Sequence, residues 1–411
     1  MKCFDTYYSR FNVAEAHIAE PPDGNLHTIV VIPCFNEPDI ATSLRSLLAC
    51  TPTLYPVEII VVVNSPENAA ESIIARNLET LATIEEIRRN NHRNDIKIFA
   101  VHSPDLPKKH AGVGFARKIG MDEAVRRFDY LEREDGIIID FDADSTCNPQ
   151  YLSAIEDYFI KNPKKEAASI YFEHPLQGDG FPSEIYSAIA KYELYLRYFV
   201  EAQRYAEFPY AFHTIGSAFA IKANVYAAAG GMNRRKAGED FYFLQKIIPR
   251  GRYGEIFSAH VYPSPRESMR VPFGTGASIT KMCATTNEYV VYNPEAFEIL
   301  KRFFATANVL QNGGEPDTDY RLKEFLTNNG FYHEIDGMIS NSASQRTFTQ
   351  RFFAWFDAFR LLKFLNFVHE KYIHKIPVEE AAAYIATTMG LLNPPTDTVE
   401  LLQWYRAKEK K

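Results

Sequence analysis

The sequence has few cysteines and no closely spaced pair of them. Its 411 residues include five, Cys3, Cys34, Cys50, Cys147 and Cys283, and no CxxC motif. Structural zinc sites and disulfide-stapled folds need clustered or paired cysteines. The spacing therefore predicts free thiols, which favours a cytoplasmic protein over a disulfide-rich secreted one.

An excess of basic residues and a long apolar run are also missing. There are 45 Lys and Arg against 52 Asp and Glu, for a net charge of −7. Binding to nucleic acid requires a basic face, so no nucleic-acid partner is expected. No run is apolar for long enough to span a membrane, and the charged segment 1–20 does not resemble a signal peptide. We expect a cytoplasmic protein, with peripheral contact to the inner face of the membrane as the alternative.

What the sequence does contain is a regular alternation of strand and helix patterns. Apolar, β-branched runs at 28–32, 57–63, 96–101 and 136–141 predict buried strands, and helical patterns at 39–50, 67–89 and 115–133 lie between them. Strands that alternate with helices form a mostly parallel sheet with right-handed crossovers. The sequence therefore predicts an α/β fold, a three-layer α/β/α sandwich.

The alternation loosens toward the C-terminus. A strand at 167–172, a long helix at 183–206, a strand at 217–221 and a helix at 239–248 are expected, followed by mainly helical segments from about residue 287. We therefore predict an N-terminal extension over 1–25, an α/β domain over 26–285 and a helical C-terminal subdomain over 286–411.

Two carboxylates follow the fourth apolar run. Asp142 and Asp144 stand at positions i and i+2, so in extended chain both side chains point to the same side. The carboxyl ends of parallel strands are where such sheets bind ligands. Hard oxygen ligands at such a place suit Mg²⁺ or Mn²⁺. The alternative is an acidic turn that leads into a helix cap.

Further polar residues follow the first two strands and open the third helix. Glu37 comes after the first strand, Asn64 ends the second, and the basic segment Lys108-Lys109-His110 leads to a helix that carries Arg117. Such residues could recognise a nucleotide or its phosphates. As alternatives, Glu37 favours a helix N-terminus, Asn64 forms a turn, and the basic segment is simply solvated.

Downstream motifs supply a general base and two cations. Glu239 and Asp240 open a helix after a Gly- and Arg-rich loop, and a carboxylate there can act as general base or as an ordinary helix cap. Arg266 and Arg270 could clamp a diphosphate or form salt bridges. His260, on an expected strand, is a candidate third metal ligand, although a lone histidine there is more often structural.

The order of these motifs resembles that of family 2 glycosyltransferases with the GT-A fold. The resemblance covers about residues 28–270. It rests on Ile-Pro-Cys-Phe-Asn-Glu, Val-Val-Val-Asn-Ser, Gly-x-x-x-Ala-Arg-Lys-x-Gly, Asp-Ala-Asp and Gly-Glu-Asp. It implies transfer of a sugar, with inversion, from a nucleotide-diphosphate sugar. A UDP-sugar is the expected donor, and glycan or polysaccharide biosynthesis the expected pathway. The acceptor would be a glycan, a lipid-linked molecule or a small molecule.

The resemblance also assigns roles to residues. Asp240 would be the catalytic base and Glu239 would help to place the acceptor, while Asp142 and Asp144 would hold a divalent cation. The residues expected to bind the donor are Pro33, Phe35, Glu37, Asn64, Arg117 and Asp142. Two departures, Asn64 where many members have Asp and Lys118 where many have Asn, leave the nucleotide open.

Three alternatives remain at this point. Asp142-x-Asp144-x-Thr146 also matches haloacid-dehalogenase-type phosphotransferases, in which Asp142 would be the nucleophile and Asp144 the acid/base. A non-catalytic nucleotide-sugar-binding remnant is the second. Third, the basic aromatic stretch 346–375 either packs inside the helical subdomain or lies on a membrane surface.

Overall fold

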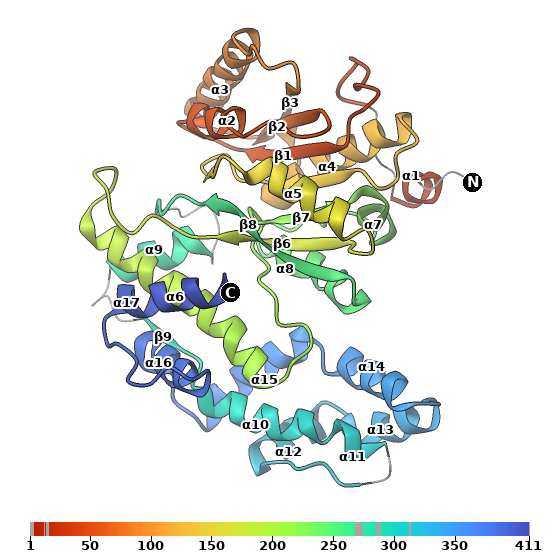
Figure 1. Cartoon of the computed structure of the whole chain (residues 1–411), viewed down its shortest axis with the longest axis vertical. Coiled ribbons are helices and arrows are strands. Elements are labelled where there is room, and N and C mark those ends of the chain that lie inside the picture. Colours follow the sequence, from red (N-terminus) through yellow and green to blue (C-terminus); the bar gives the residue numbers. More distant parts are fainter. Residues whose placement is uncertain are drawn as a thin grey trace. The chain divides into compact units, whose positions relative to one another are not determined.

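The computed structural model of the chain describes residues 4–11, 13, 16–267, 274–284, 289–311 and 314–410 (Figure 1). The chain divides into two units. The first, which we call the sheet unit, comprises Met1–Pro175 and Thr214–Ala277, and the second, the helical unit, comprises Leu176–His213 and Ser278–Lys411. The helical unit thus includes the segment 176–213, which the sequence analysis assigned to the α/β domain.

Four apolar strands form the parallel half of the sheet. They are β1 (Thr28–Cys34), β2 (Val57–Pro66), β3 (Ile96–Leu106) and β4 (Ile137–Asp140), and they are connected through α2 (Ile40–Leu48), α3 (Glu71–Arg89) and α4 (Val113–Tyr130). The order is β3-β2-β1-β4 with every neighbour parallel. Nearly all residues of β1, β2 and β4 are buried, because helices flank the sheet and cover these continuous apolar runs.

The other half of the sheet is mixed. Its strands are β5 (Thr146–Cys147), β6 (Ala167–Phe172), β7 (Phe219–Lys222) and β8 (Tyr253–Tyr262), and its helices are α5 (Tyr151–Lys161), α7 (Ala223–Ala228), α8 (Glu239–Leu244) and the 3-10 turn η1 (Ile248–Arg250). The full order is β3-β2-β1-β4-β7-β6-β8-β5. β7 is antiparallel to both β4 and β6, whereas β6 and β8 are parallel. This mostly parallel sheet with flanking helices confirms the expected GT-A-type fold.

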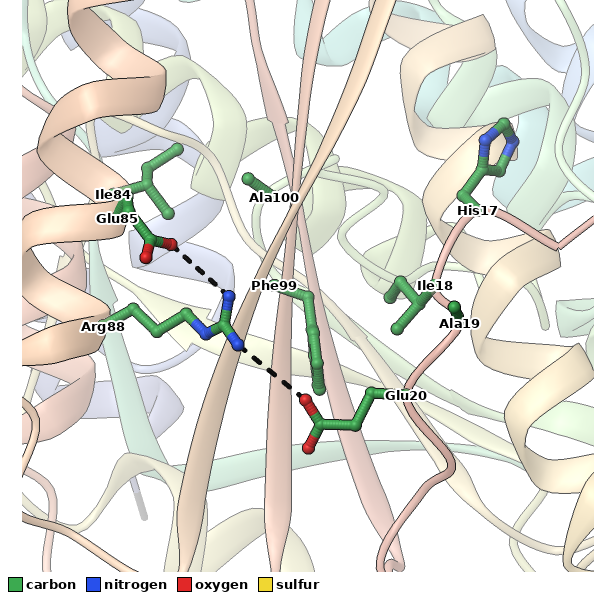
Figure 2. Close-up of a pocket in the computed structure, with 9 residues that line it drawn as sticks. All are labelled: His17, Ile18, Ala19, Glu20, Ile84, Glu85, Arg88, Phe99 and Ala100. Atoms are coloured by element: carbon green, nitrogen blue, oxygen red, sulfur yellow. Dashed lines mark hydrogen bonds and ion pairs between the residues drawn. The ribbon is translucent and has the colours of Figure 1, made fainter.

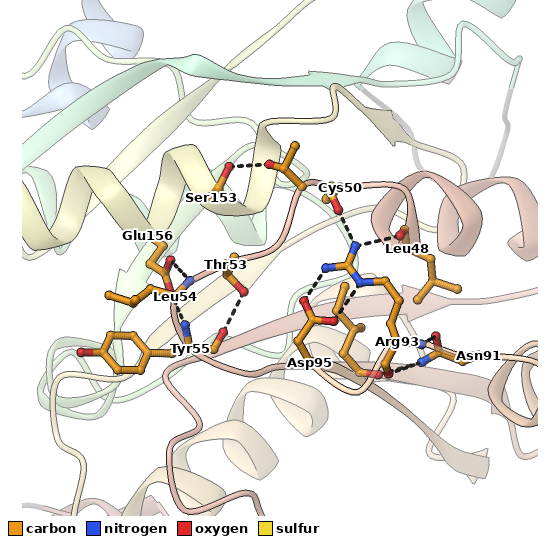
Figure 3. Close-up of polar contacts among 12 residues, drawn as sticks. Leu48, Cys50, Thr53, Leu54, Tyr55, Asn91, Arg93, Asp95, Ser153 and Glu156 are labelled. Atoms are coloured by element: carbon orange, nitrogen blue, oxygen red, sulfur yellow. Dashed lines mark hydrogen bonds and ion pairs between the residues drawn. The ribbon is translucent and has the colours of Figure 1, made fainter.

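A charged residue of α5 holds the loop before β2. The Glu156 carboxylate accepts backbone hydrogen bonds from Leu54 (2.7 Å) and Tyr55 (3.0 Å). Arg93 pairs with Asp95 and donates to the carbonyl of Leu48 at 3.0 Å (Figure 3). These charge-assisted bonds satisfy the polar backbone of the turns and so hold the starts of β2 and β3 in place.

Lys118, which departs from the family pattern, has a structural role. Its ammonium lies 2.9 Å from Asp122 Oδ2, and Asp122 Oδ1 also accepts hydrogen bonds from Tyr7 (2.6 Å) and Tyr226 (2.8 Å). Tyr7 belongs to α1 (Asp5–Phe11), so this buried network attaches the N-terminal helix to α4 and α7. A buried carboxylate with three donors is well satisfied, which explains why a lysine is tolerated inside the domain.

The helical unit is built on one long helix. Its elements are α6 (Ser183–Tyr205), β9 (Val290–Val291), α10 (Pro294–Ala305), α11 (Ala307–Leu310), α12 (Tyr320–Asn328), α13 (Phe331–Ser340), α14 (Gln345–Trp355), α15 (Ala358–Lys371), β10 (Ile376–Pro377), α16 (Val378–Thr388) and α17 (Thr398–Glu409), and α9 (Thr275–Cys283) leads into it. Inside it, Arg197 of α6 is fully buried and pairs with Glu193 and with Glu409 of α17. This ionic contact joins helices that are far apart in the sequence.

The aromatic stretch 346–375 forms α14 and α15, and most of its rings are buried. Phe348, Phe352, Phe356 and Phe364 are fully buried in the helical unit, whereas Phe359 is 36% exposed. Edge-on contacts such as that of Phe304 with Phe356, with centroids 5.1 Å apart, make up this core. The packed-core interpretation therefore describes the stretch. Among the described helices, none combines the length and apolarity needed to cross a membrane.

Candidate active site

The loop after β1 is held in place by Asn77 of α3, a residue that belongs to none of the sequence motifs. Asn36 has a positive φ of 48°, a conformation that asparagine tolerates better than most residues. Its N–H donates to Asn77 Oδ1 (3.0 Å), and Asn77 Nδ2 donates to the carbonyl of Asn64 (2.9 Å). One amide of α3 therefore ties the expected donor-binding ends of β1 and β2 together. Asn64 of β2 is buried, and Pro33 and Phe35, at the end of β1, are partly buried.

Glu37 forms an ion pair with Arg266, which lies far away in the sequence. Arg266 donates from Nη1 to Glu37 Oε1 (3.0 Å) and from Nη2 to Oε2 (2.6 Å). The same Nη2 lies 3.0 Å from Asp144 Oδ2. Glu37 is only 3% exposed, and the fork neutralises its buried charge. Arg270, the second arginine considered for a diphosphate clamp, lies outside the described residues.

The Asp142–Asp144 turn is attached to α2. The hydroxyl of Ser43 lies 2.7 Å from the carbonyl of Ala143 and 2.6 Å from that of Ser145, so its single proton can serve either acceptor. Because Ser43 is buried, this hydrogen bond holds the turn against α2. The carboxylates of Asp142 and Asp144 remain about one-third exposed, with 35% and 33% of each side chain accessible.

Arg117 of α4 is the centre of the acidic motifs. Its Nε lies 2.6 Å from Asp140 Oδ2, its Nη2 lies 2.6 Å from Asp142 Oδ1, and its Nη1 bonds Glu239. Arg117 is 4% exposed, so these contacts form out of water. The guanidinium thus joins the carboxylate pair after β4 to the Glu-Asp pair that opens α8.

Two of the acids that contact Arg117, Asp140 and Glu239, are buried, whereas Asp142 is partly exposed. Burial raises the pKa of Asp140 well above its usual range, although the charge of Arg117 opposes this. Glu239 is 2% exposed and points to Arg117. Its position favours a role in placing Arg117 and Asp142 over direct contact with an acceptor.

Asp240 combines partial exposure with a perturbed pKa. Its Oδ1 accepts the N–H of Phe241 at 2.7 Å, in the first turn of α8. Burial and then the nearby charge of Glu239 raise the pKa of Asp240 to about 7, while Arg117 works in the opposite direction. A carboxyl group that titrates near neutral pH is well suited to general base catalysis.

The expected metal ligands Asp142 and Asp144 are not joined by a third candidate side chain among the described residues. Across the residues that the structure describes, no group of three or more His, Cys, Asp and Glu side chains is arranged to hold a metal ion. His260 therefore does not join Asp142 and Asp144. Its Nε2 lies 3.0 Å from the carbonyl of Phe257, and its ring packs on Tyr171 with centroids 4.7 Å apart.

A separate cavity of about 270 Å³ lies across the edge strand β3, away from these motifs (Figure 2). In it, Arg88 is placed between the carboxylates of Glu85 and Glu20, at 3.4 Å and 3.8 Å. The lining residues are His17, Ile18, Ala19, Glu20, Ile84, Glu85, Arg88, Phe99 and Ala100. It shares no lining residue with the acidic motifs, and its one arginine is already neutralised.

Residues 29–228 match the family described as glycosyl transferase family 2. The chain contains a family 2 glycosyltransferase domain. Residues 29–228 span β1 to α7 and include Glu37, Asn64, Arg117, Asp142 and Asp144, so the expected family is confirmed on these motifs. The Glu239-Asp240 pair follows after the matched range.

Among solved structures, the chain is similar to S. aureus TarS. The TarS 1-349 structure in complex with UDP-GlcNAc is 15% identical, covers 93% of this chain and 92% of that chain, and has a TM-score of 0.41. The corresponding complex with UDP is 15% identical, covers 94% and 88%, and has a TM-score of 0.39. No curated protein matches the chain.

Sequence reasoning on this glycosyltransferase domain missed the residues that organise the site. Asn77 and Ser43 carry no motif, since a buried amide or hydroxyl inside a helix has no sequence signature. The contact of Arg266 with Glu37 was missed because its two partners lie 229 positions apart.

Proposed function

We propose that this family 2 glycosyltransferase transfers a sugar from a nucleotide-diphosphate sugar, a UDP-sugar first of all, to an acceptor hydroxyl with inversion. The observation that carries the proposal is the contact of Arg117 with both Asp142 and Glu239. It brings the expected donor motif and the expected base motif into one site, although they are about a hundred residues apart in sequence. Asp240, the neighbour of Glu239, is then close enough to serve the same reaction.

In this proposal Asp240 is the base. Its carboxylate accepts the proton of the acceptor hydroxyl while the oxygen attacks the anomeric carbon, and the nucleoside diphosphate leaves on the opposite face. A single displacement of this kind inverts the configuration. The pKa of about 7 leaves a substantial fraction of Asp240 ionised at neutral pH, with enough basicity to take the proton.

Asp142 and Asp144 would hold a divalent cation, Mg²⁺ or Mn²⁺. Both are hard oxygen ligands with accessible side chains, and a two-carboxylate site leaves the remaining positions to water and phosphate oxygens, as Mg²⁺ prefers. When bound, the cation would neutralise negative charge on the leaving diphosphate. Arg266 lies beside Asp144 and is the protein cation best placed to bind the same phosphates.

The remaining assignments follow from these positions. Pro33, Phe35, Glu37 and Asn64 would form the nucleotide side of the site, and Arg117 and Glu239 would position Asp142 rather than touch substrate. All belong to the sheet unit, so the helical subdomain proposed for 286–411 is given no catalytic residue. A cytoplasmic setting and glycan biosynthesis remain part of the proposal, on the ground that the five cysteines are scattered and form no CxxC pair.

The first test is thermal stabilisation of the purified chain by UDP, GDP, CMP and dTDP, each with and without Mn²⁺. A ligand that binds the folded state raises its apparent stability. We expect a Mn²⁺-dependent shift with UDP that Asp144→Ala removes. Turnover of UDP-sugars, with the product anomer read by NMR, then tests the reaction. Nucleotide binding without turnover of any acceptor offered would instead support a non-catalytic binding protein.

A further inference from the structure

Five basic side chains lie on two loops that contact each other near the proposed base. Lys108 and Lys109 lie in the loop between β3 and α4, and Arg234, Arg235 and Lys236 lie in the loop before α8. All five are exposed. We call this set the basic cluster. It is a concentration of positive charge on a protein with a net charge of −7, and the proposed reaction gives it no role so far.

The two loops are in direct contact. A methyl group added at Gly112 would lie 2.8 Å from Lys236 Cα, and one added at Gly114 would lie 2.4 Å from the carbonyl oxygen of Arg235. Both distances are shorter than packed atoms allow, so only glycine permits this approach. The tertiary structure therefore builds the basic cluster from two separate segments of the sheet unit.

The cluster is held in place without being neutralised. Arg234 Cζ lies 4.9 Å above the ring of Phe115, and Arg235 Cζ lies 3.7 Å above the ring of Tyr242. Aromatic faces orient a guanidinium and leave its positive charge available. The nearby carboxylate of Glu67 accepts the backbone N–H of Lys108 at 3.2 Å.

The ion pairs of the sheet unit also indicate that the basic cluster is not neutralised. Within the described part of the chain, none of the five side chains of the basic cluster forms a salt bridge with a carboxylate. By contrast, Arg117 and Arg266, the two arginines of the candidate site, contact five acids between them: Asp140, Asp142, Glu239, Glu37 and Asp144. Like charges held together without counter-charges repel, and an anionic ligand relieves that repulsion.

The position of the cluster assigns it to the acceptor. Lys236 is separated from Glu239 only by Ala237 and Gly238, and the methyl position of Gly114 lies 2.9 Å from Glu239 Cβ. The donor motifs have their own cation, Arg266, beside Asp144. The basic cluster is thus adjacent to the base that would deprotonate the acceptor.

We propose that the basic cluster binds phosphate groups of the acceptor, so that the acceptor is a phosphate-bearing molecule. Guanidinium and ammonium groups are the usual ligands of phosphate oxygens. This inference rests on the proposed function, because it names the acceptor class of the same site. In this proposal Arg234, Arg235 and Lys236, in the loop before α8, determine which acceptor binds. Asp240 still accepts the proton.

The test uses the full-length chain and a fluorescein-labelled abasic deoxyribose-phosphate hexamer, a phosphodiester chain without bases. Its uncharged methylphosphonate counterpart serves as the ligand control. The test variant is Arg234→Gln/Arg235→Gln/Lys236→Gln. The matched control is Lys323→Gln/Arg346→Gln/Arg351→Gln, which removes three exposed cations of the helical unit. Binding is followed by fluorescence anisotropy, and UDP binding by calorimetry with the same proteins.

The proposal expects at least a tenfold loss of hexamer affinity in the α8-loop variant and a smaller dependence on salt concentration, since each lost phosphate contact lowers the log–log slope by about 0.7. The control variant and UDP binding should be unchanged. Equal losses in both variants would show only general charge attraction and overturn the proposal. A loss of UDP affinity instead would assign the cluster to the donor, and overturn the acceptor assignment while the proposed function stands. Hexamer binding without any nucleotide binding would refute the proposed function separately.

Discussion

Arg266 donates two hydrogen bonds to the carboxylate of Glu37, one of 3.0 Å from Nη1 to Oε1 and one of 2.6 Å from Nη2 to Oε2. Glu37 follows β1 and Arg266 follows β8, so this pair closes one side of the site within the sheet unit. Because Nη2 also reaches Asp144, the arginine already stands where the proposed diphosphate would need a cation.

The first prediction concerns this fork. Arg266→Met should lower the free energy of unfolding by about 1–3 kcal/mol, because it leaves the buried Glu37 carboxylate unpaired. Adding Glu37→Gln should restore part of the loss, since an amide costs less to bury than an unpaired charge. Chemical denaturation of the two single variants and the double variant measures the coupling. Purely additive effects would contradict the importance of the pair.

The second prediction separates the partners of Arg117. Arg117→Met should destabilise the sheet unit by about 3–5 kcal/mol, because it leaves the buried Glu239 and the partly exposed Asp142 without a counter-charge. Asp140→Asn should cost less than about 1 kcal/mol. Burial raises the pKa of Asp140 well above its usual range, and asparagine keeps the shape of the side chain, so this substitution should remove less favourable charge interaction than the loss of Arg117 does. Equal losses in both variants would argue that Asp140 is ionised.

The third prediction is a pH dependence of catalysis. The pKa of Asp240 is raised to about 7 by burial and by Glu239, so kcat/KM should fall about tenfold per pH unit below pH 7. Asp240→Asn should lower kcat by about 10²–10⁴-fold, the range for loss of a general base. A flat profile between pH 5.5 and 8 would assign the base elsewhere.

The same pKa gives an independent prediction for stability. A carboxyl whose pKa is raised on folding binds its proton more tightly in the folded state, so its favourable contribution exists at low pH and disappears as the pH rises through about 7. Asp240→Asn removes the cost of ionising a buried acid. It should therefore be more stable than the original chain at neutral pH, with a difference that shrinks as the pH falls and disappears only below about 3.8, the ordinary pKa of an aspartate, as measured by thermal unfolding across this range.

A fourth prediction addresses the helical unit. Burial alone would raise the pKa of Glu409, but the charge of Arg197 and the contact with His213 outweigh it and lower the pKa to about 2. A lowered pKa stabilises the folded state above the unfolded pKa of about 4.5, and this contribution is lost as the pH falls toward 2. Its full size is roughly 3 kcal/mol.

Acid unfolding followed by circular dichroism provides the measurement. Glu409→Gln should flatten the loss of stability between pH 4.5 and 2, while Glu400→Gln, an exposed carboxylate of the same helix, should leave it unchanged. If both variants follow the original curve, Glu409 does not control acid stability.

The extent of successful prediction differs between the two halves of the sheet. The strand expected at 167–172 matches β6. The four apolar runs match β1 to β4, with longer ends for β1, β2 and β3 and a slightly shorter β4. The short β5 was not predicted, because two residues have no periodicity to recognise, and the helix α5 was not predicted either. The segment 176–213 lies within the range predicted for the α/β domain, but it belongs to the helical unit, where α6 packs on α16 and α17.

By itself, the sequence determined the parallel core and the location of the acidic motifs. Continuous, β-branched apolar runs that alternate with helices favour buried central strands, and residues that follow parallel strands meet at one edge of the sheet. Only the tertiary structure decided which cation meets which acid. Arg117 and Glu239 lie 122 positions apart, and Arg266 and Glu37 lie 229 apart. Such partners depend on side-chain packing between distant segments, which local patterns do not encode. The meeting of two basic loops through Gly112 and Gly114 has the same origin.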